Sequence, residues 1–184
     1  RRKFLGSMNE KDAQVLERAT HTIVQQVEAM KGMVNAFSEY ARAPQLVLEP
    51  FDLNALVAEV AELYRAGERP VQVELALEAG LEAVEADRGR VRQILSNLLK
   101  NAMEALEGTP DPQVHVATRR AEWHGQPVVQ SEVVDNGPGF QRELMGQVFD
   151  PYVTSKPKGT GLGLAIVKKV VEEHGGRIEA HNGP

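Results

Sequence analysis

Three glycines occupy every second position in Gly159-Thr160-Gly161-Leu162-Gly163, which runs directly into an apolar segment with helical spacing. The backbone of such a loop can approach a ligand closely, and the helix that follows points its N-terminus at the same place. This arrangement suits a phosphate. A helix N-terminus stabilises an anion by only about 0.3–1 kcal/mol, whereas micromolar binding needs about 8 kcal/mol. Other parts of the chain must therefore contribute to any nucleotide site.

Two carboxamides stand four residues apart, at Asn97 and Asn101, in a segment whose apolar residues have helical spacing. They therefore project from one face of one helix, with Lys100 beside them. A carboxamide oxygen is a neutral ligand for Mg²⁺, which prefers oxygen and commonly bridges substrate phosphates. Taken alone, the same residues are explained more simply as the solvated face of a surface helix.

Asp135 ends an apolar stretch and is followed closely by Gly137 and Gly139. An ionised carboxylate only accepts hydrogen bonds, and adenine offers an exocyclic amine as donor where guanine offers an oxygen acceptor. A buried aspartate beside glycines could therefore select adenine. The alternative is an ordinary turn, because Asp-Asn-Gly is common turn chemistry.

Charge and composition argue against several other classes of function. The 184 residues carry 21 Lys and Arg against 26 Asp and Glu, a net charge of -5 without a long basic run, so nucleic acid is a poor candidate ligand. There is no cysteine, which excludes disulfides and thiolate chemistry. No apolar run approaches the roughly 18 residues that cross a bilayer. The glycines match neither a Walker-type phosphate loop nor the dinucleotide-binding fingerprint.

Residues 10–43 predict one long helix. They contain no proline, and their apolar or small residues recur three and four apart at Leu16, Ala19, Ile23, Met30, Met33, Phe37 and Tyr40. This heptad-like stripe is wide enough for a helical bundle and needs a partner, either another chain or a preceding helix with its tail at 1–5. Pro44 ends the helix, and the stretch from Pro44 to Pro50 predicts a stiff linker at a domain boundary.

The remaining segments predict an α+β sandwich, with helices and antiparallel strands segregated. Helical spacing is found at 53–64, 88–107 and 165–174, and strand-like patterns at 71–77, 83–86, 114–120, 127–134 and 177–181. Asp52 and Asp87 are the expected N-caps of the first two helices, and Gly67 is expected to stop the first. Residues 153–158 have little periodicity, which predicts a mobile lid.

Taken in order, these motifs closely resemble the catalytic region of two-component sensor histidine kinases, relatives of gyrase, Hsp90-type chaperones and mismatch-repair ATPases. Four segments resemble the family's conserved boxes. They are Asn97–Ala102 for the N box, Asp135–Gly139 for the first glycine box, Phe149–Tyr152 for the F box and Gly159–Leu164 for the second glycine box. The likeness covers about residues 50–181, and the preceding helix is similar to the second helix of that family's dimerisation and phosphotransfer hairpin. The nitrogen-regulation sensor kinases are the most similar subfamily.

The resemblance implies a two-layer, Bergerat-type ATP-binding fold that uses Mg²⁺ and ATP. Asn101 would be the Mg²⁺ ligand and Asp135 the adenine contact. Asn97 and Lys100 would lie near the phosphates, and Lys156 would approach the γ-phosphate. The remaining nucleotide contacts would come from Gly137, Gly139, Gly159, Thr160, Gly161, Leu162 and Gly163. Hydrolysing relatives carry a glutamate base at position 97, and since the amide of Asn97 cannot take a proton, ATP is expected to be held for a phosphoacceptor.

The resemblance also implies two parts. Residues 1–48 would hold mainly the second hairpin helix and the linker, and residues 49–184 the ATP-binding catalytic domain without its last strand. The expected partners are a second copy of the chain, bound through the N-terminal helix, and the receiver domain of a response regulator. The expected location is the cytoplasm, with any membrane attachment outside this chain.

The phosphoacceptor histidine is the main departure from the family. The family's acceptor lies in the first hairpin helix, before an acidic residue and a proline, whereas His21 lies in the second helix and precedes Thr22. We therefore expect a protein-histidine kinase fragment without its phosphorylation site. Two alternatives stay open: an ATP-hydrolysing relative, and a degenerate domain that serves only as a dimerisation scaffold.

Overall fold

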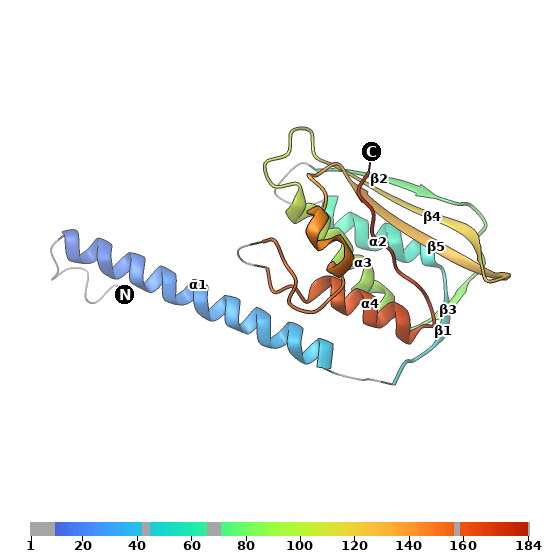
Figure 1. Ribbon diagram of the computed structural model, residues 1–184, viewed down its shortest axis with the longest axis horizontal. Coiled ribbons are helices and arrows are strands. Elements are labelled where there is room, and N and C mark those ends of the chain that lie inside the picture. The colour runs from blue at the N-terminus through green and yellow to red at the C-terminus, as the bar shows by residue number, and fades with distance from the viewer. Residues whose placement is uncertain (1–9, 42–44, 66–70, 157–158, 184) are drawn as a thin grey trace.

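The computed structural model describes residues 10–41, 45–65, 71–156 and 159–183 (Figure 1). One long helix, α1 (Glu10–Ala41), precedes a domain of mixed helices and strands. The helix predicted over residues 10–43 is thus confirmed up to Ala41. Its predicted end at Pro44 and the hairpin tail expected at 1–5 lie outside the described residues, as does the stop expected at Gly67.

The apolar stripe of α1 faces outward. Ile23, Val27, Met30 and Val34 each have more than half of their surface exposed, at 62%, 56%, 66% and 61%. Most of α1 extends away from the domain, and it contacts the domain through α4 (Figure 1). In the described part of the chain, no helix combines the length and apolar content that a bilayer crossing requires.

The main sheet has the strand order β2-β4-β5. β2 (Gln72–Leu77) runs parallel to β4 (Gln113–Trp123), and β5 (Gln126–Asp135) returns antiparallel to β4. The predicted hairpin is confirmed, and its two-residue turn has positive φ at His124 (51°) and Gly125 (74°), as a turn that matches the twist of the strands requires.

A second, two-stranded sheet pairs β1 (Glu49–Phe51) with β3 (Val84–Ala86) in antiparallel register. The expectation that the linker continues to Pro50 is therefore wrong, because Pro50 lies opposite Glu85 in this sheet. A strand of three residues shows no periodicity that sequence patterns can detect, and its pairing with β3 is what defines it.

Two helices cover one face of the main sheet (Figure 1). Apolar residues of α2 (Leu53–Arg65) and α3 (Arg88–Ala105) pack against alternate residues of β2 and β4. The buried cluster comprises Leu53, Leu56, Val57, Val60, Ala61, Val73, Leu95, Leu99, Ala102, Leu106, Val114 and Val116. On the opposite face of β4, His115 and Arg119 are exposed. The predicted two-layer α+β sandwich is confirmed.

α4 (Gly163–Glu173) packs against α3, so that α3 contacts both the sheet and α4. Leu162, Ile166 and Val170 are almost fully buried there and pack with Ile94 of α3. A short 3-10 helix, η2 (Arg142–Gln147), stands between the sheet and the segment that leads to α4.

The strand predicted at 177–181 is wrong: in the described structure this segment pairs with no strand. Its alternation has a different cause. Ile178 and Ala180 are partly buried, while Arg177, Glu179 and His181 are exposed. The alternating pattern therefore arises because one side of the segment is partly buried, and not because its backbone pairs with a strand.

Candidate functional site

α3 carries the predicted N box and is capped at its N-terminus. Asp87 caps its N-terminus, where the carboxylate accepts a hydrogen bond from the backbone N–H of Arg90 at 3.0 Å. Asn97 and Asn101 are partly buried along the helix, and Lys100 is exposed. Because Leu95, Leu99 and Ala102 face the core, the two asparagines project from the side of α3 that is not buried against the sheet.

The first glycine box lies against the C-terminal end of α3. Asp135, the last residue of β5, accepts a hydrogen bond from the N–H of Gly137 through Oδ1 at 2.9 Å. A Cβ atom on Gly137 would lie 3.2 Å from the carbonyl oxygen of Ala105. Ala105 is one turn beyond Asn101, so Asp135 and the proposed metal ligand lie near the same helix.

Asn136 fixes the beginning of this loop to the neighbouring strand. Its Oδ1 accepts from the N–H of Gln113 at 2.8 Å, and its Nδ2 donates to the carbonyl oxygen of Asp111 at 3.0 Å. The Asp-Asn-Gly stretch is therefore a turn in which each polar side chain bonds backbone, as turn chemistry predicts. The turn and the adenine contact are not exclusive, because a carboxylate has further lone pairs beyond the one that Gly137 uses.

The second glycine box packs against the F box, and a backbone hydrogen bond joins the two. Gly161 has φ of +66°, and a Cβ atom there would lie 2.5 Å from the carbonyl carbon of Tyr152, so only glycine fits. The carbonyl oxygen of Gly161 accepts from the N–H of Tyr152 at 2.9 Å. Next to this loop, the hydroxyl oxygen of Thr160 accepts from the N–H of Leu162 at 3.4 Å.

The start of α4 meets Asn97. A Cβ atom on Gly163, the first residue of α4, would lie 3.7 Å from Asn97 Oδ1. Leu162 stands at the N-cap, and its side chain has no polar atom that could cap the first N–H groups of the helix. The N-terminus of α4 is therefore a place where backbone donors and the helix dipole favour an anion beside α3.

Lys156 bridges the predicted lid to α3. Its Nζ donates to Asn101 Oδ1 at 2.8 Å and to the Asn101 carbonyl at 3.3 Å, and it pairs with Glu104 Oε2 at 2.8 Å. The amide oxygen and the carboxylate thus converge on one cation. Sequence patterns gave Glu104 no role, although it lies about one turn after Asn101, on the same side of α3.

The oxygens at this point fit the chemistry of Mg²⁺. They are hard donors that already share one positive charge, the Lys156 ammonium. Among the described residues, no group of three or more His, Cys, Asp and Glu is placed to hold a metal ion. A magnesium ion here would need phosphate and water oxygens in addition to the protein, which is how Mg²⁺ is commonly bound with nucleotides.

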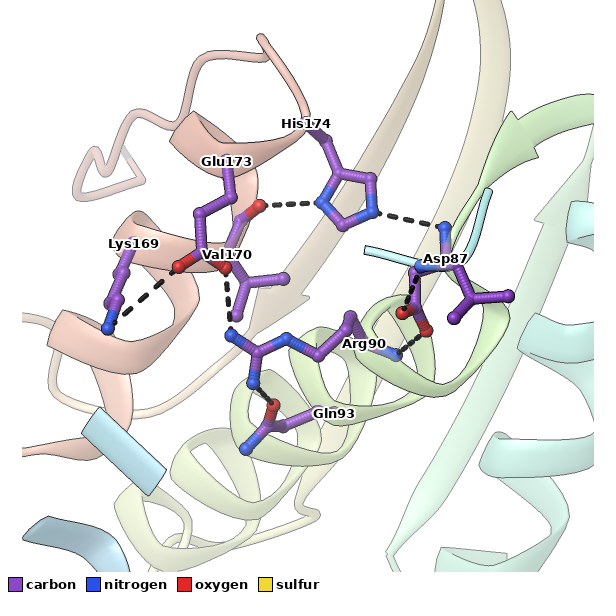
Figure 2. Close-up of polar contacts among 8 residues, drawn as sticks. Asp87, Arg90, Gln93, Lys169, Val170, Glu173 and His174 are labelled. Atoms are coloured by element: carbon purple, nitrogen blue, oxygen red, sulfur yellow. Dashed lines mark hydrogen bonds and ion pairs between the residues drawn. The ribbon is translucent and has the colours of Figure 1, made fainter. Parts of the chain in front are cut away.

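A polar cluster, the α3–α4 clasp, joins the N-terminus of α3 to the C-terminus of α4 (Figure 2). It consists of Asp87, Arg90, Gln93, Glu173 and His174. Arg90 Nη2 pairs with Glu173 Oε2 at 2.8 Å, with side-chain exposures of 13% and 24%, and Arg90 Nη1 donates to Gln93. His174 Nε2 accepts from the N–H of Asp87 at 3.1 Å, while its Nδ1 lies 2.7 Å from the carbonyl oxygen of Val170.

The clasp perturbs the titration of Asp87. Partial burial favours its neutral form, but hydrogen bonds from the N–H groups of Arg90 and Val47, with the nearby His174, outweigh burial and lower the pKa of Asp87. Asp87 is therefore held as a carboxylate at the start of α3. The clasp fixes α4 relative to α3 and so maintains the approach of Gly163 to Asn97.

The residues predicted as one site lie around one helix. Gly137 lies at the C-terminal end of α3 with Asp135 beside it, Lys156 contacts Asn101 one turn before that end, and Gly163 faces Asn97 one turn earlier still. The predicted lid is described only up to Lys156, and residues 157–158 lie outside the described part.

Comparison with known proteins identifies the family. The model of the family described as histidine kinase-, DNA gyrase B-, and HSP90-like ATPase matches residues 86–184. The chain belongs to this ATPase family. A similar member is the nitrogen regulation protein NtrY of Azorhizobium caulinodans, 37% identical over 100% of this chain and 24% of the length of NtrY. The predicted resemblance to nitrogen-regulation sensor kinases is thereby confirmed.

Solved structures of the family have the same fold. Full-length ShkA in complex with AMPPNP is 31% identical, with a TM-score of 0.69 over 86% of this chain and 34% of ShkA. The histidine kinase ThkA in complex with the response regulator protein TrrA is 27% identical, with a TM-score of 0.68 over 88% of this chain and 45% of that chain. The chain therefore spans only about a quarter to a half of these relatives.

Proposed function

We propose that this chain is the ATP-binding catalytic region of a sensor histidine kinase, which holds Mg²⁺ and ATP and supports transfer of the γ-phosphoryl to a histidine. The observation that carries the proposal is that Gly137, Lys156 and Gly163, which are far apart in the sequence, all lie against α3. Membership of the ATPase family and the likeness to kinases crystallised with AMPPNP and with a response regulator support it.

The site residues divide between the two ends of the nucleotide. Asp135, with the backbone at Gly137 and Gly139, would accept the adenine amine. Asn101 would hold Mg²⁺, which neutralises phosphate charge when bound, and Asn97 and Lys100 would lie beside the phosphates. The backbone from Gly159 to Gly163 would surround the phosphate end, where the N-terminus of α4 favours negative charge. The physical basis of the reaction would be positioning and charge neutralisation.

Lys156 has two roles in this proposal. Its ammonium donates to Asn101 Oδ1 and pairs with Glu104, so a metal ion bound to Asn101 would displace it from the asparagine oxygen. Its ammonium would then be available to approach the γ-phosphate from the lid. The metal ion would replace the ammonium as the positive charge near Asn101, so the Glu104 carboxylate would have a cation nearby with or without the metal.

Transfer to histidine is favoured over hydrolysis by the residue at position 97. Asn97 Oδ1 lies near the first residue of α4, where a base for an attacking water would stand, and an amide cannot take a proton at neutral pH. None of the five histidines matches the family's phosphoacceptor. His21 is followed by Thr22 where the acceptor is followed by an acidic residue, and the other four histidines follow residue 114, in the ATP-binding part. The phosphoacceptor is therefore expected outside residues 1–184.

The partners follow from the same assignment. Residues 1–48 would supply mainly the second helix of a dimerisation and phosphotransfer hairpin, and residues 49–184 the ATP-binding domain. The N-terminal helix would bind a second copy of the chain, and the phosphohistidine would pass its phosphoryl to the receiver domain of a response regulator. A cytoplasmic location is proposed, since ATP and receiver domains are found there, and any membrane attachment would come from other sequence.

The decisive experiment mixes this chain with radiolabelled ATP, Mg²⁺ and a separate full hairpin that carries the acceptor histidine. Acid-labile, base-stable label on the hairpin is expected, and its absence when Asn101→Ala replaces the wild type is the control. Steady phosphate release without label on the hairpin would instead favour an ATP-hydrolysing enzyme. Failure of the chain to bind ATP at all would favour a scaffold without activity.

A further inference from the structure

The segment after α4 is tied to the first glycine box by one side chain. Asn182 Oδ1 accepts from the backbone N–H of Phe140 at 2.8 Å, and Asn182 Nδ2 donates to the backbone carbonyl oxygen of Phe140 at 2.8 Å. One carboxamide thus satisfies both backbone groups of a residue 42 positions earlier. Those two bonds are what a paired strand would supply, yet this segment pairs with no strand among the described residues.

The tie acts on Gly139, the residue next to Phe140. Gly139 has φ of +73°, in the left-handed region, and a Cβ atom there would lie 2.7 Å from Asn182 Oδ1. The carboxamide therefore packs directly against the glycine that turns the loop. At its other end, the N–H of Gln113 donates to Asn136 Oδ1, which holds the loop to the neighbouring strand, and within the loop the N–H of Gly137 donates to Asp135 Oδ1.

We propose that Asn182 is a positioning residue for nucleotide binding, which holds Gly139 and Phe140 so that the loop from Asp135 to Gly139 is shaped before the adenine arrives. The inference rests on the proposed function, which assigns this loop to adenine. A loop held in its binding conformation loses less conformational freedom when the ligand binds, so affinity rises without any contact between Asn182 and the ligand.

The chemistry at position 182 is specific. The carboxamide presents one acceptor and one donor, which match the N–H and the carbonyl of Phe140. An aspartate has two acceptors and no donor, so it would keep the bond from the Phe140 N–H and set a carboxylate oxygen against the Phe140 carbonyl. Asn182→Asp is therefore expected to retain half of the tie.

The test measures ATP affinity by calorimetry with Mg²⁺ for the whole chain, wild type and Asn182→Ala, together with hydrogen exchange of individual amides. Asn182→Ala is expected to weaken ATP binding about tenfold, because the released loop would have to be ordered when ATP binds. The Phe140 amide is expected to exchange faster, and the amides of β4 at an unchanged rate. His181→Ala is the matched control, because its exposed side chain precedes Asn182 and its removal is expected to leave both readouts unchanged.

Several results would overturn the inference. ATP affinity within twofold of the wild type in Asn182→Ala would do so, and so would equal acceleration of exchange at Phe140 and throughout β4, since this indicates a general loss of stability. If Asn182→Ala does not fold, Asn182→Asp is measured in the same way, and unchanged affinity there rejects the positioning role. A wild-type chain that does not bind ATP rejects the proposed function itself, whereas loss confined to Asn182 variants supports both.

Discussion

At the scale of single residues, the site depends on which side-chain oxygen atoms are placed to accept hydrogen bonds or to hold a metal ion. Asp135 is partly buried and ends β5, and its carboxylate accepts from the N–H of Gly137, which fixes its orientation. Asn101 offers one amide oxygen, which accepts a hydrogen bond from Lys156 Nζ. A change that removes the acceptor of Asp135 or the ligand atom of Asn101 therefore tests each role separately.

Asp135→Asn exchanges an acceptor for a donor at nearly constant volume. We expect it to weaken ATP binding by about 1–3 kcal/mol, or roughly one to two orders of magnitude in Kd, because the adenine amine would face another donor. Calorimetry measures the affinity. Glu132→Gln, which removes a negative charge from an exposed position of the same strand, is the control and is expected to bind ATP normally. Equal affinity in wild type and Asp135→Asn would remove Asp135 from the adenine role.

Asn101→Ala tests the metal ligand. The wild type is expected to bind ATP more tightly with Mg²⁺ than with a chelator, and the variant equally in both conditions, because the protein ligand for the ion is gone. Thermal unfolding of the variant checks that the fold is retained, since Lys156 keeps its contact with Glu104. A metal effect of the same size in both proteins would contradict the assignment of Asn101.

At the scale of elements, α3 organises the site because it lies between the sheet and α4. The α3–α4 clasp contributes to this arrangement from the end of α3 opposite to the adenine loop (Figure 2). Its ion pair between Arg90 and Glu173 is mostly buried, and the loss of one member leaves the other charge poorly compensated.

Glu173→Gln is expected to lower the free energy of unfolding by about 1–2 kcal/mol, because the Arg90 guanidinium loses a charged hydrogen-bond partner in a partly buried place. Urea unfolding at neutral pH measures it. Glu172→Gln is the matched control, because Glu172 is the exposed neighbour on the same helix, and surface changes of this kind usually stay within about 0.5 kcal/mol. Equal stability of the two variants would show that the ion pair contributes nothing measurable.

Asp87 makes the same region sensitive to acid. Its folded-state pKa is lowered, so its charge stabilises the fold above the unfolded-state value of about 3.9, and this contribution is lost as pH falls through the folded-state pKa. Asp87→Asn keeps a good N-cap without the charge. The wild type is therefore expected to be the more stable protein near about pH 6, and the difference is expected to shrink below about pH 4. A difference independent of pH in urea unfolding would reject this account.

Features that depend on neighbouring residues could be predicted from the sequence, whereas features that depend on contacts between distant segments could not. The helical spacing around Leu95 and Ala102, the cap at Asp87 and the hairpin before Asp135 depend on local rules, and the structure confirms them. The pairing of β1 with β3 and the parallel pairing of β2 with β4 depend on contacts between distant segments, for which one sequence carries no local signal. The same holds for Lys156 at Asn101, and for Asn182, whose segment resembles a strand only because one side of it is covered.

At the scale of the whole molecule, α1 is the feature that the domain does not explain. Its core-like side chains remain exposed over several turns, among them Ile23, Met30 and Phe37 at 62%, 66% and 52%. A contiguous apolar stripe of this length normally marks an interface. Each such side chain that becomes buried contributes about 1.5–3 kcal/mol, so the pairing of two stripes can outweigh the entropy lost on association.

The chain is therefore expected to form dimers through α1, with sedimentation equilibrium at about 10–100 μM as the measurement, the range that standard interface affinities make accessible. Ile23→Glu places a charge in the middle of the stripe, where burial without a partner is costly, and is expected to raise the dimer Kd at least tenfold. Gln25→Glu adds a charge of the same sign on the opposite side of α1, where it stays solvated, and is expected to leave association unchanged. A wild-type chain that stays monomeric over this concentration range would reject the stripe as the dimer interface. Equal weakening of dimerisation by Ile23→Glu and Gln25→Glu would also reject it, because the two substitutions add the same charge and differ only in whether the dimer buries it.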